Sequence, residues 1–392
     1  MEEETHGIVI IGGGICGLAT ALALHRKGIA SLVLEKSETL RADGATIGIH
    51  ANGWRVLDQL GVAAELRETA NLITAYHDAW LQGNKSNLIP IRNEFRRVNR
   101  KDLIETLAKN LPVGSIRFGC HIAAIHEDPG IHGAVLTTMD GSTIRAKVLI
   151  GCDGTNSVAA KYLGLSVPKP IPRTVLRGFT RYPHGHPFGT EFLRLRGENF
   201  FLGRLPVTDD LVHFFVTCPN PSTGITKDVG AMKDFVLEKL QECPAEITEM
   251  VRASDPESLN VVAKLWYRPP WQVMFGTFQK GAVTVAGDAM HAMGPFIGQG
   301  GSAGLEDAVV LARSLARATV GREPCDKKTI GVAIGKYVRE RRPRVAMLSL
   351  ESYVVGTLLR AKWHVTKLAC VAVLALVGSR SLRHTDYDCG RL

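Results

Sequence analysis

A glycine-rich segment near the start of the chain holds the first residues whose spacing could serve chemistry. Gly12, Gly14 and Gly17 fit the pattern G-x-G-x-x-G, and Glu35 follows roughly 20 residues further on. The first glycine permits a tight turn, the second lets a pyrophosphate approach the backbone, and the third lets a helix and a strand pack closely. The helix N-terminus supplies N–H donors, and the acid accepts hydrogen bonds from a ribose. The segment predicts a dinucleotide site and leaves NAD and FAD both open.

A second glycine-rich segment lies late in the chain, over residues 287–301. It contains Asp288 and ends with Gly298, Gly300 and Gly301, just before an apolar helical stretch. At the carboxyl end of a strand, Asp288 is placed to bind sugar-like hydroxyl groups of an extended ligand. Bare N–H groups at a helix start would stabilise negative charge on an electron-accepting ring. For His291, in the same segment, we expect a structural hydrogen bond rather than proton transfer.

A third segment, Gly151-Cys152-Asp153-Gly154-Thr155-Asn156-Ser157, follows an apolar run that ends at Ile150. An Asp-Gly pair at a strand end is, on its own, a tight turn. Taken alone, this segment is equally compatible with a plain turn and with a binding role.

The elements around these segments indicate an α/β domain. The β-branched run 7–11, the helical pattern 15–27 and the apolar run 31–35 form a strand–helix–strand unit. Residues 282–286 form another buried strand, and a strong helix over about 300–318 follows it.

The middle of the chain has a different pattern. Short β-type runs separated by turns cover 116–151 and suggest a meander. From about 167 to 275, short strands alternate with proline-containing turns and with helical stretches near 230–253. We interpret this part as a separate, sheet-rich domain and the chain from about 329 onward as mostly helical. The clearest strands expected in the sheet-rich domain are 191–195, 211–217 and 261–267.

Composition and charge indicate the class of protein and bear on its partners. The chain has 392 residues, 45% hydrophobic and 22% charged, as expected for a folded protein of more than one domain. Its net charge of +9 is spread along the sequence, and the densest basic cluster, at 339–344, has no nucleic-acid-binding motif beside it. We therefore expect a solvated helix face there and no nucleic-acid partner.

The eight cysteines and the N-terminus bear on the compartment. The cysteines lie far apart without a C-x-x-C pair, which favours neither a disulfide framework nor a metal site. The acidic N-terminus has no basic stretch of the kind that starts a signal peptide. We expect a reducing compartment, most simply the cytoplasm, and no bound metal.

The most apolar run of the chain, residues 368–377, lies near the C-terminus. A helix needs ~20 apolar residues to cross a bilayer, so this run is too short to span one. A packing helix and a peripheral membrane contact both remain open.

Taken together, the three segments resemble the flavin-dependent aromatic hydroxylase family, the single-component FAD monooxygenases similar to salicylate and para-hydroxybenzoate hydroxylases. Within that family the chain most resembles the plant monooxygenases, over residues 7–318. The resemblance implies an α/β fold: a Rossmann-like FAD-binding domain with an inserted β-sheet substrate domain and a helical C-terminal segment. The implied boundaries are 1–75, 97–166 and 276–325 for the FAD-binding domain, 76–96 and 167–275 for the substrate domain, and 326–392 for the C-terminal segment.

The resemblance also assigns FAD-binding residues. Ser302 stands where many relatives carry Asn, and Met290 where many carry Ala, so the chain departs slightly from the family around the flavin. The residues implied to contact FAD are Gly12, Gly14, Ile15, Cys16, Gly17, Glu35, Lys36, Arg41, Arg100, Asp153, Asp288, Pro295, Gly298, Gly300, Gly301 and Ser302.

The implied reaction is an oxygen insertion. NAD(P)H reduces FAD, reduced flavin reacts with O2, and a flavin C4a-hydroperoxide delivers one oxygen atom to a small aromatic or other electron-rich metabolite, by hydroxylation or epoxidation. Two alternatives stay open: an FAD-dependent reductase or oxidase of the same fold without oxygen insertion, and a non-catalytic flavin-binding protein. Oligomeric state is not indicated.

Residues for the substrate are less well defined. A general base that deprotonates a phenol would assist the reaction, and Arg177 or Arg194 could hold a carboxylate. Each of these side chains could equally have a packing role. The candidates for the base are Tyr182, His213 and Tyr267.

Overall fold

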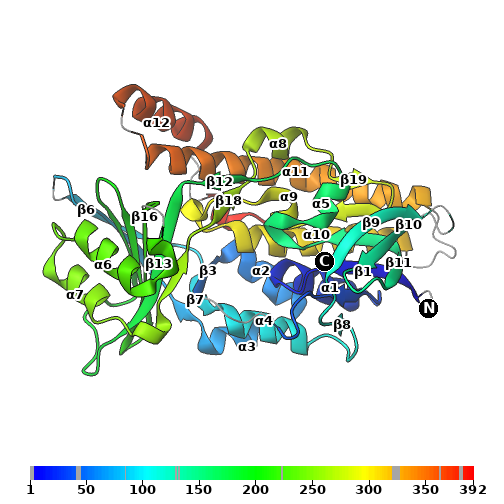
Figure 1. Ribbon diagram of the computed structural model, residues 1–392, viewed down its shortest axis with the longest axis horizontal. Coiled ribbons are helices and arrows are strands. Elements are labelled where there is room, and N and C mark those ends of the chain that lie inside the picture. Colours follow the sequence, from blue (N-terminus) through cyan, green and yellow to red (C-terminus); the bar gives the residue numbers. More distant parts are fainter. Residues whose placement is uncertain are drawn as a thin grey trace.

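The computed structural model describes residues 4–40, 46–83, 85–128, 130, 133–221, 224–319, 327–361, 363–378 and 383–392. The molecule is elongated, with one sheet toward each end and long helices along its upper edge (Figure 1).

The first sheet, at the right of Figure 1, is built around the N-terminal strand. β1 pairs in parallel with β2 on one side and with β11 on the other, and the strand order is β19-β20-β11-β1-β2-β8. β9 and β10 extend β11 as an antiparallel meander. The strands are β1 (Glu4–Ile11), β2 (Leu32–Leu34), β8 (Ile116–Arg117), β9 (Ile122–Asp128), β10 (Gly133–Thr138), β11 (Thr143–Gly151), β19 (Gln279–Lys280) and β20 (Val283–Val285).

The apolar residues of β1, β2 and β11 are buried because helices cover this sheet. α1 packs against α10, and α10 packs in turn against α2 and α11. The helices of this half are α1 (Ile15–Arg26), α2 (Ala51–Leu60), α3 (Ala63–Thr69), α4 (Arg100–Lys109), α5 (Val158–Tyr162), α9 (Asp288–His291) and α10 (Gly300–Thr319).

The second sheet has seven strands in the order β17-β13-β16-β15-β14-β5-β6. Its residues alternate between two faces, and α6 (Val229–Lys239) and α7 (Ala245–Arg252) cover one of them (Figure 1). The opposite face is turned toward the first sheet. The strands are β5 (Ala75–Trp80), β6 (Lys85–Pro90), β13 (Arg173–Arg181), β14 (Glu191–Arg196), β15 (Phe201–Thr208), β16 (Leu211–Pro219) and β17 (Asn260–Val262).

Two small sheets and a few short segments connect the halves. β3 (Thr46–His50), β7 (Phe95–Asn99) and β4 (Asn71–Leu72) form one small sheet, and β12 (Lys169–Ile171) and β18 (Leu265–Tyr267) the other. The strand expected over 261–267 is therefore two strands, since β17 joins β13 while β18 joins β12. The remaining short segments are α8 (Pro270–Phe275), η1 (Gly154–Asn156), η2 (Ile225–Lys227), η3 (Pro256–Ser258) and η4 (Pro295–Ile297).

The C-terminal part is helical, as predicted. α11 (Lys327–Leu358) runs along the upper edge in Figure 1, followed by α12 (His364–Gly378) and η5 (Arg383–Asp386). The last residues return to the first half, where Lys27 Nζ donates to the carbonyl of Leu392 at 2.7 Å. Among the described residues, none of the helices has the length and apolar character needed to cross a membrane. The predicted fold class, α/β with a sheet-rich insertion and a helical C-terminal segment, is confirmed.

Candidate active site

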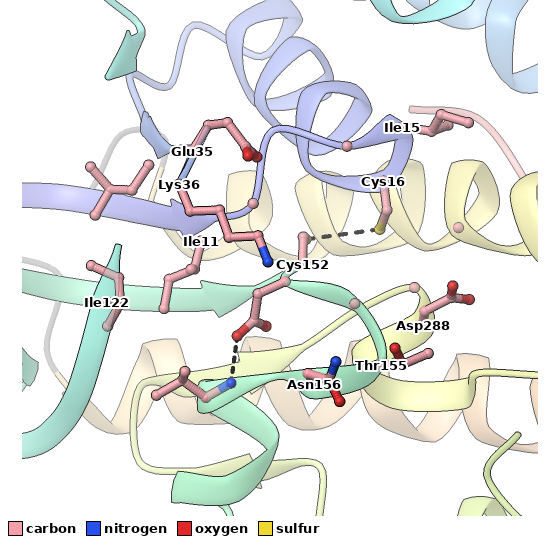
Figure 2. A pocket seen from close by; sticks show the side chains of 18 of the residues that line it. Ile11, Ile15, Cys16, Glu35, Lys36, Ile122, Cys152, Thr155, Asn156 and Asp288 are labelled. Carbon is pink, nitrogen blue, oxygen red and sulfur yellow. Dashed lines mark hydrogen bonds between the residues drawn. The ribbon is translucent and has the colours of Figure 1, made fainter. Parts of the chain in front are cut away.

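A cavity of about 550 Å³ lies at the carboxyl ends of β1, β11 and β20, where parallel strands present binding residues. All three glycine-rich segments contribute to it, and Figure 2 shows Glu35 and Asp288 on opposite sides of the cavity. The residues from the sequence prediction that line it are Gly12, Gly14, Ile15, Cys16, Glu35, Lys36, Arg100, Asp153, Asp288, Gly300 and Gly301.

Four other predicted residues that the structure describes, Gly17, Pro295, Gly298 and Ser302, are not among those that line the cavity. Gly17 faces the glycine loop itself, and Ser302 is buried behind the start of α10 with no hydrogen-bond partner for its Oγ in the described part of the chain. Pro295 and Gly298 belong to η4 and the turn after it. Arg41 lies outside the described residues.

Close packing explains two of the glycines of the first segment. Gly12 has a φ of +103°, and a Cβ there would lie 2.5 Å from the carbonyl oxygen of Cys152. A Cβ on Gly17 would lie 1.9 Å from the carbonyl oxygen of Gly12, so α1 can approach the loop only because this residue lacks a side chain. Gly14 differs, since a Cβ there meets nothing within 4 Å and would project into free space.

Glu35, at the end of β2, holds the glycine loop in place. Its Oε2 accepts the N–H of Gly13 at 2.7 Å, and its Oε1 accepts the N–H of Ser37 at 3.0 Å. The side chain is buried and lines the cavity. Carboxylate oxygens accept hydrogen bonds from hydroxyl groups, so Glu35 has the chemistry to bind a ligand hydroxyl.

Asp153 and Asp288 are the other carboxylates of the cavity. Asp153 Oδ1 accepts from Ser157 Oγ at 2.5 Å and its Oδ2 accepts the N–H of Val158 at 2.6 Å, so it fixes the start of α5. Burial raises the pKa of this carboxyl. Asp288 is open to the cavity, yet protein surrounds its remaining sides and raises the pKa of its carboxyl through desolvation.

Two cysteines join the first and third segments. Cys16 Sγ and Cys152 Sγ lie 3.8 Å apart, as the dashed line in Figure 2 shows. Gly287, with a φ of +61°, packs against the side chain of Cys16: a Cβ on Gly287 would lie 2.9 Å from Cys16 Cβ. Thus Cys16 is the point at which the three glycine-rich segments meet.

Several lining residues come from outside the segments that the sequence singled out. Ile47 on β3 and His121 before β9 both line the cavity. No local pattern indicates these positions, since only the pairing of distant strands places them here. Thr155 and Asn156 also line it; they belong to the third segment but were not among the residues implied to contact FAD, and their place directly after Asp153 was the signal for them.

A buried ionic network supports the second segment. Asp307 on α10 accepts the N–H of Gly287 at 2.9 Å and the Nε–H of Arg341 at 2.7 Å. Glu306, beside it, pairs with Arg341 Nη1 at 2.7 Å and accepts from Asn52 Nδ2 at 2.7 Å. This network ties α2, α10 and α11 to the loop after β20.

The sheet face turned toward the cavity holds one of the three candidate bases. His213 on β16 is buried, its Nδ1 lies 3.3 Å from Thr46 Oγ1 on β3, and its Nε2 has no partner among the described residues. Burial lowers the pKa of His213 to about 3. Tyr182 lies away from this face, packed with Phe188 in the core beneath α6 and α7.

Tyr267 on β18 stands apart from both. Its ring stacks with that of Tyr353 on α11, with the ring centroids 5.7 Å apart, and both border a small cavity beside Gly294 and Phe296. The structure therefore does not bring the three candidates together.

The two candidate arginines differ in their partners. Arg194 donates to Asp78 through Nε at 2.6 Å and through Nη2 at 3.0 Å. Arg177 is half-buried and has no hydrogen bond or ion pair in the part of the chain that the structure describes. Burial lowers its pKa, and the nearby positive charge of Arg100 lowers it further. Arg177 is therefore the arginine that remains available to an anion.

The features of the cavity fit FAD. Bare glycine backbone lies at the start of α1 and of α10, and a carboxylate stands on each side for hydroxyl groups. A dinucleotide needs this combination of N–H donors for its phosphates and acceptors for its sugars.

Comparison with known proteins identifies the family. Residues 5–349 match the model of the FAD binding domain family. Monooxygenase 1 and Monooxygenase 2 of Arabidopsis thaliana are 46% and 37% identical to this chain, each across 100% of both chains. Klebsiella pneumoniae HpxO, solved with FAD and uric acid, shares the fold with a TM-score of 0.80 at 24% identity, over 97% of this chain and 96% of that one. This chain thus belongs to the FAD binding domain family and is an FAD-dependent monooxygenase.

Proposed function

We propose that the enzyme uses NAD(P)H and O2 to insert one oxygen atom into a small, electron-rich aromatic molecule that carries a negative charge. One observation carries this proposal: the dinucleotide cradle adjoins a sheet face rich in aromatic rings, and this face includes an arginine that has no acidic partner among the described residues. Ile47, which lines the cradle, lies on β3, and Thr46 on the same strand contacts His213 of the sheet.

The chain's own groups suit each part of the cofactor. The N–H groups from Gly14 onward, at the start of α1, would hold the pyrophosphate, Glu35 the adenosine ribose and Asp288 the hydroxylated chain toward the flavin. The start of α10, at Gly300 and Gly301, offers N–H donors that would stabilise negative charge on the flavin ring. FAD, when bound, supplies electron transfer and oxygen activation.

The substrate would lie against the aromatic side of the second sheet. Cross-strand pairing sets Phe179, His213 and Leu205 in one row with Phe192 and Tyr76. Phe215 lies in the neighbouring row, 6.3 Å from Phe192 between ring centroids. Rings of this kind bind a flat aromatic molecule by stacking and exclude water from it.

Arg177 is the reason to expect a negatively charged substrate. Arg177 on β13 lies directly across from Phe215 on the neighbouring strand β16. Its positive charge also lowers the pKa of His213. A half-buried guanidinium without a carboxylate partner is costly, and an anionic ligand would compensate it. A carboxylate would accept two parallel hydrogen bonds from it.

His213 suits substrate positioning better than general-base catalysis. With a pKa of about 3 its imidazole is neutral near pH 7 and accepts a proton only weakly. Its unpartnered Nε2 can instead hydrogen-bond a hydroxyl group of the substrate and set the orientation of the ring.

The test is a screen of NAD(P)H consumption with the purified, FAD-loaded enzyme. Aromatic carboxylates are compared with neutral phenols, indoles and amines, and products are analysed by mass for one added oxygen. We expect faster NAD(P)H consumption and an oxygenated product with an aromatic acid. Consumption with no added oxygen would indicate a reductase or oxidase instead, and a preference for neutral substrates would refute the anionic part of the proposal.

A further inference from the structure

Helix α12 is apolar on nearly every side and yet largely exposed. Its residues 368–377 contain no charged side chain. Val365 is 78% exposed, Leu368 70% and Val371 52%, whereas Cys370 faces the protein. A helix that is apolar all round is normally covered by protein or by lipid. The outer side of α12 therefore lacks a partner within the described part of this chain.

Helix α8 adds a second exposed apolar group. Phe275 is 81% exposed, and Trp271 and Met274 on the same short helix are also exposed. Both α8 and α12 pack on α11, and in Figure 1 both rise above it along the upper edge of the molecule. Exposed apolar patches of this kind mark surfaces that bind a partner. We call these two helices the α8–α12 surface.

The sequence on either side of α12 carries charge of one sign. Between Glu351 and Asp386 the sequence contains no acidic residue, while it contains five basic ones. Trp363, directly before α12, is exposed, and Lys169 Nζ lies 5.7 Å from the centre of the Trp271 ring. The basic residues of this stretch are Arg360, Lys362, Lys367, Arg380 and Arg383.

We propose that the α8–α12 surface docks onto an anionic lipid membrane and lies in its headgroup region. Apolar side chains, exposed tryptophans and flanking basic residues are the features that hold a helix in that region. The 15 residues of α12 extend over about 22 Å, less than the ~30 Å of a bilayer core, so the helix lies along the membrane without crossing it.

A second copy of the chain suits this surface less well. Two copies that met through α12 would bring the same basic stretches together and leave their charges without acidic partners. Anionic lipid supplies those partners. Charge complementarity therefore favours the membrane over self-association.

Vesicle sedimentation of the FAD-loaded, full-length protein tests this proposal. One set of vesicles is phosphatidylcholine alone, and the other also contains phosphatidylserine. We expect the protein to sediment with the mixed vesicles, less with phosphatidylcholine alone, and less at high salt. Changing Leu368→Glu and Val371→Glu together should weaken binding to mixed vesicles by at least about tenfold.

A matched variant and a spectroscopic measurement serve as controls. Val113→Glu with Met139→Glu adds the same charge at exposed apolar positions on the turns between α4 and β8 and between β10 and β11, elements that Figure 1 shows well away from α12, and should bind vesicles as the natural protein does. Tryptophan emission should shift to shorter wavelength with mixed vesicles, and Trp363→Phe should reduce that shift. The proposal is overturned if the natural protein stays in solution with both kinds of vesicle. It is equally overturned if sedimentation velocity shows a dimer that the α12 variant dissociates.

Discussion

Nε2 of His291 lies 2.6 Å from Oδ2 of Asp307, and both side chains are fully buried. The neighbouring side chains of His291 and Arg341 hold the pKa of the Asp307 carboxyl well below its ordinary value, although burial alone would raise it. Through this carboxylate, α10 fixes the loop that carries Asp288 into the cavity. The role of His291 in the structure is a hydrogen bond within this network.

Replacing Asp307 with Asn should therefore destabilise the protein. The change leaves Arg341 with Glu306 as its acidic partner, and we expect a loss of about 3 kcal/mol in the free energy of unfolding. Because the native pKa is depressed, this contribution is fully present above the ordinary carboxyl pKa of about 4 and declines as pH falls below it. Urea unfolding at several pH values measures the difference, with exposed Asp234→Asn as the control. Equal stability of the natural protein and Asp307→Asn at neutral pH would contradict it.

Two glycines of the first segment should respond differently to the same change. Gly17→Ala places a Cβ 1.9 Å from a carbonyl oxygen and should lower the melting temperature markedly, with or without FAD. Gly14→Ala meets no protein atom within 4 Å, so the protein should fold normally and lose at least about tenfold in FAD affinity. Thermal unfolding and titration with FAD separate the two effects. Unchanged FAD affinity in Gly14→Ala would mean that the cofactor does not lie against this residue.

Much of the fold could be predicted because its local signals are strong, and the exceptions have physical causes. β15 (Phe201–Thr208) was not among the predicted strands, since Gly203 and Pro206 are poor strand residues. In the structure the Phe215 ring fills the space beside Gly203, and the strand shifts register between Pro206 and Thr208. Tertiary packing thus makes a central strand from residues that do not favour one.

The same limit applies to the site. The glycine-rich segments could be recognised because each is contiguous, whereas Arg177 and Arg194 could not be told apart. Arg194 is neutralised by Asp78, which lies 116 residues earlier in the chain and reaches it only when β5 joins β14. Whether an arginine is free to bind an anion depends on such distant partners, so the local sequence does not indicate it.

The buried histidine of the sheet should make stability sensitive to acid. The native pKa of His213 is about 3, because of burial and the nearby charges of Arg177 and Arg97, against about 6.5 in the unfolded chain. Below pH 6.5 the unfolded state binds a proton that the folded state does not, so stability falls by about 1.4 kcal/mol per pH unit until about pH 3. Burial also lowers the pKa of His50 to about 3, so His50 adds a similar dependence of stability on pH.

His213→Asn should remove one of these two contributions. Urea unfolding between pH 4 and 7 gives the slope of stability against pH, and the variant should show a shallower slope than the natural protein. Thr46→Val is the matched control, since it removes the hydrogen-bonding partner of His213 Nδ1 and leaves the titrating group in place. An identical slope in His213→Asn would show that this imidazole is not held neutral in the folded state.

Arg177, for which the described part of the chain offers no acidic partner, should determine which substrates bind. For an aromatic carboxylate, Arg177→Gln should raise KM by about 10- to 100-fold, the effect of losing a hydrogen bond between charged groups, with FAD affinity unchanged. The methyl ester of the same acid is the matched substrate and should show little difference between the natural enzyme and the variant. Arg194→Gln should instead lower stability, because the buried Asp78 would then keep only Arg196, 3.9 Å away, as a charged partner among the described residues. If Arg177→Gln impaired the acid and its ester equally, the arginine would shape the site without recognising charge.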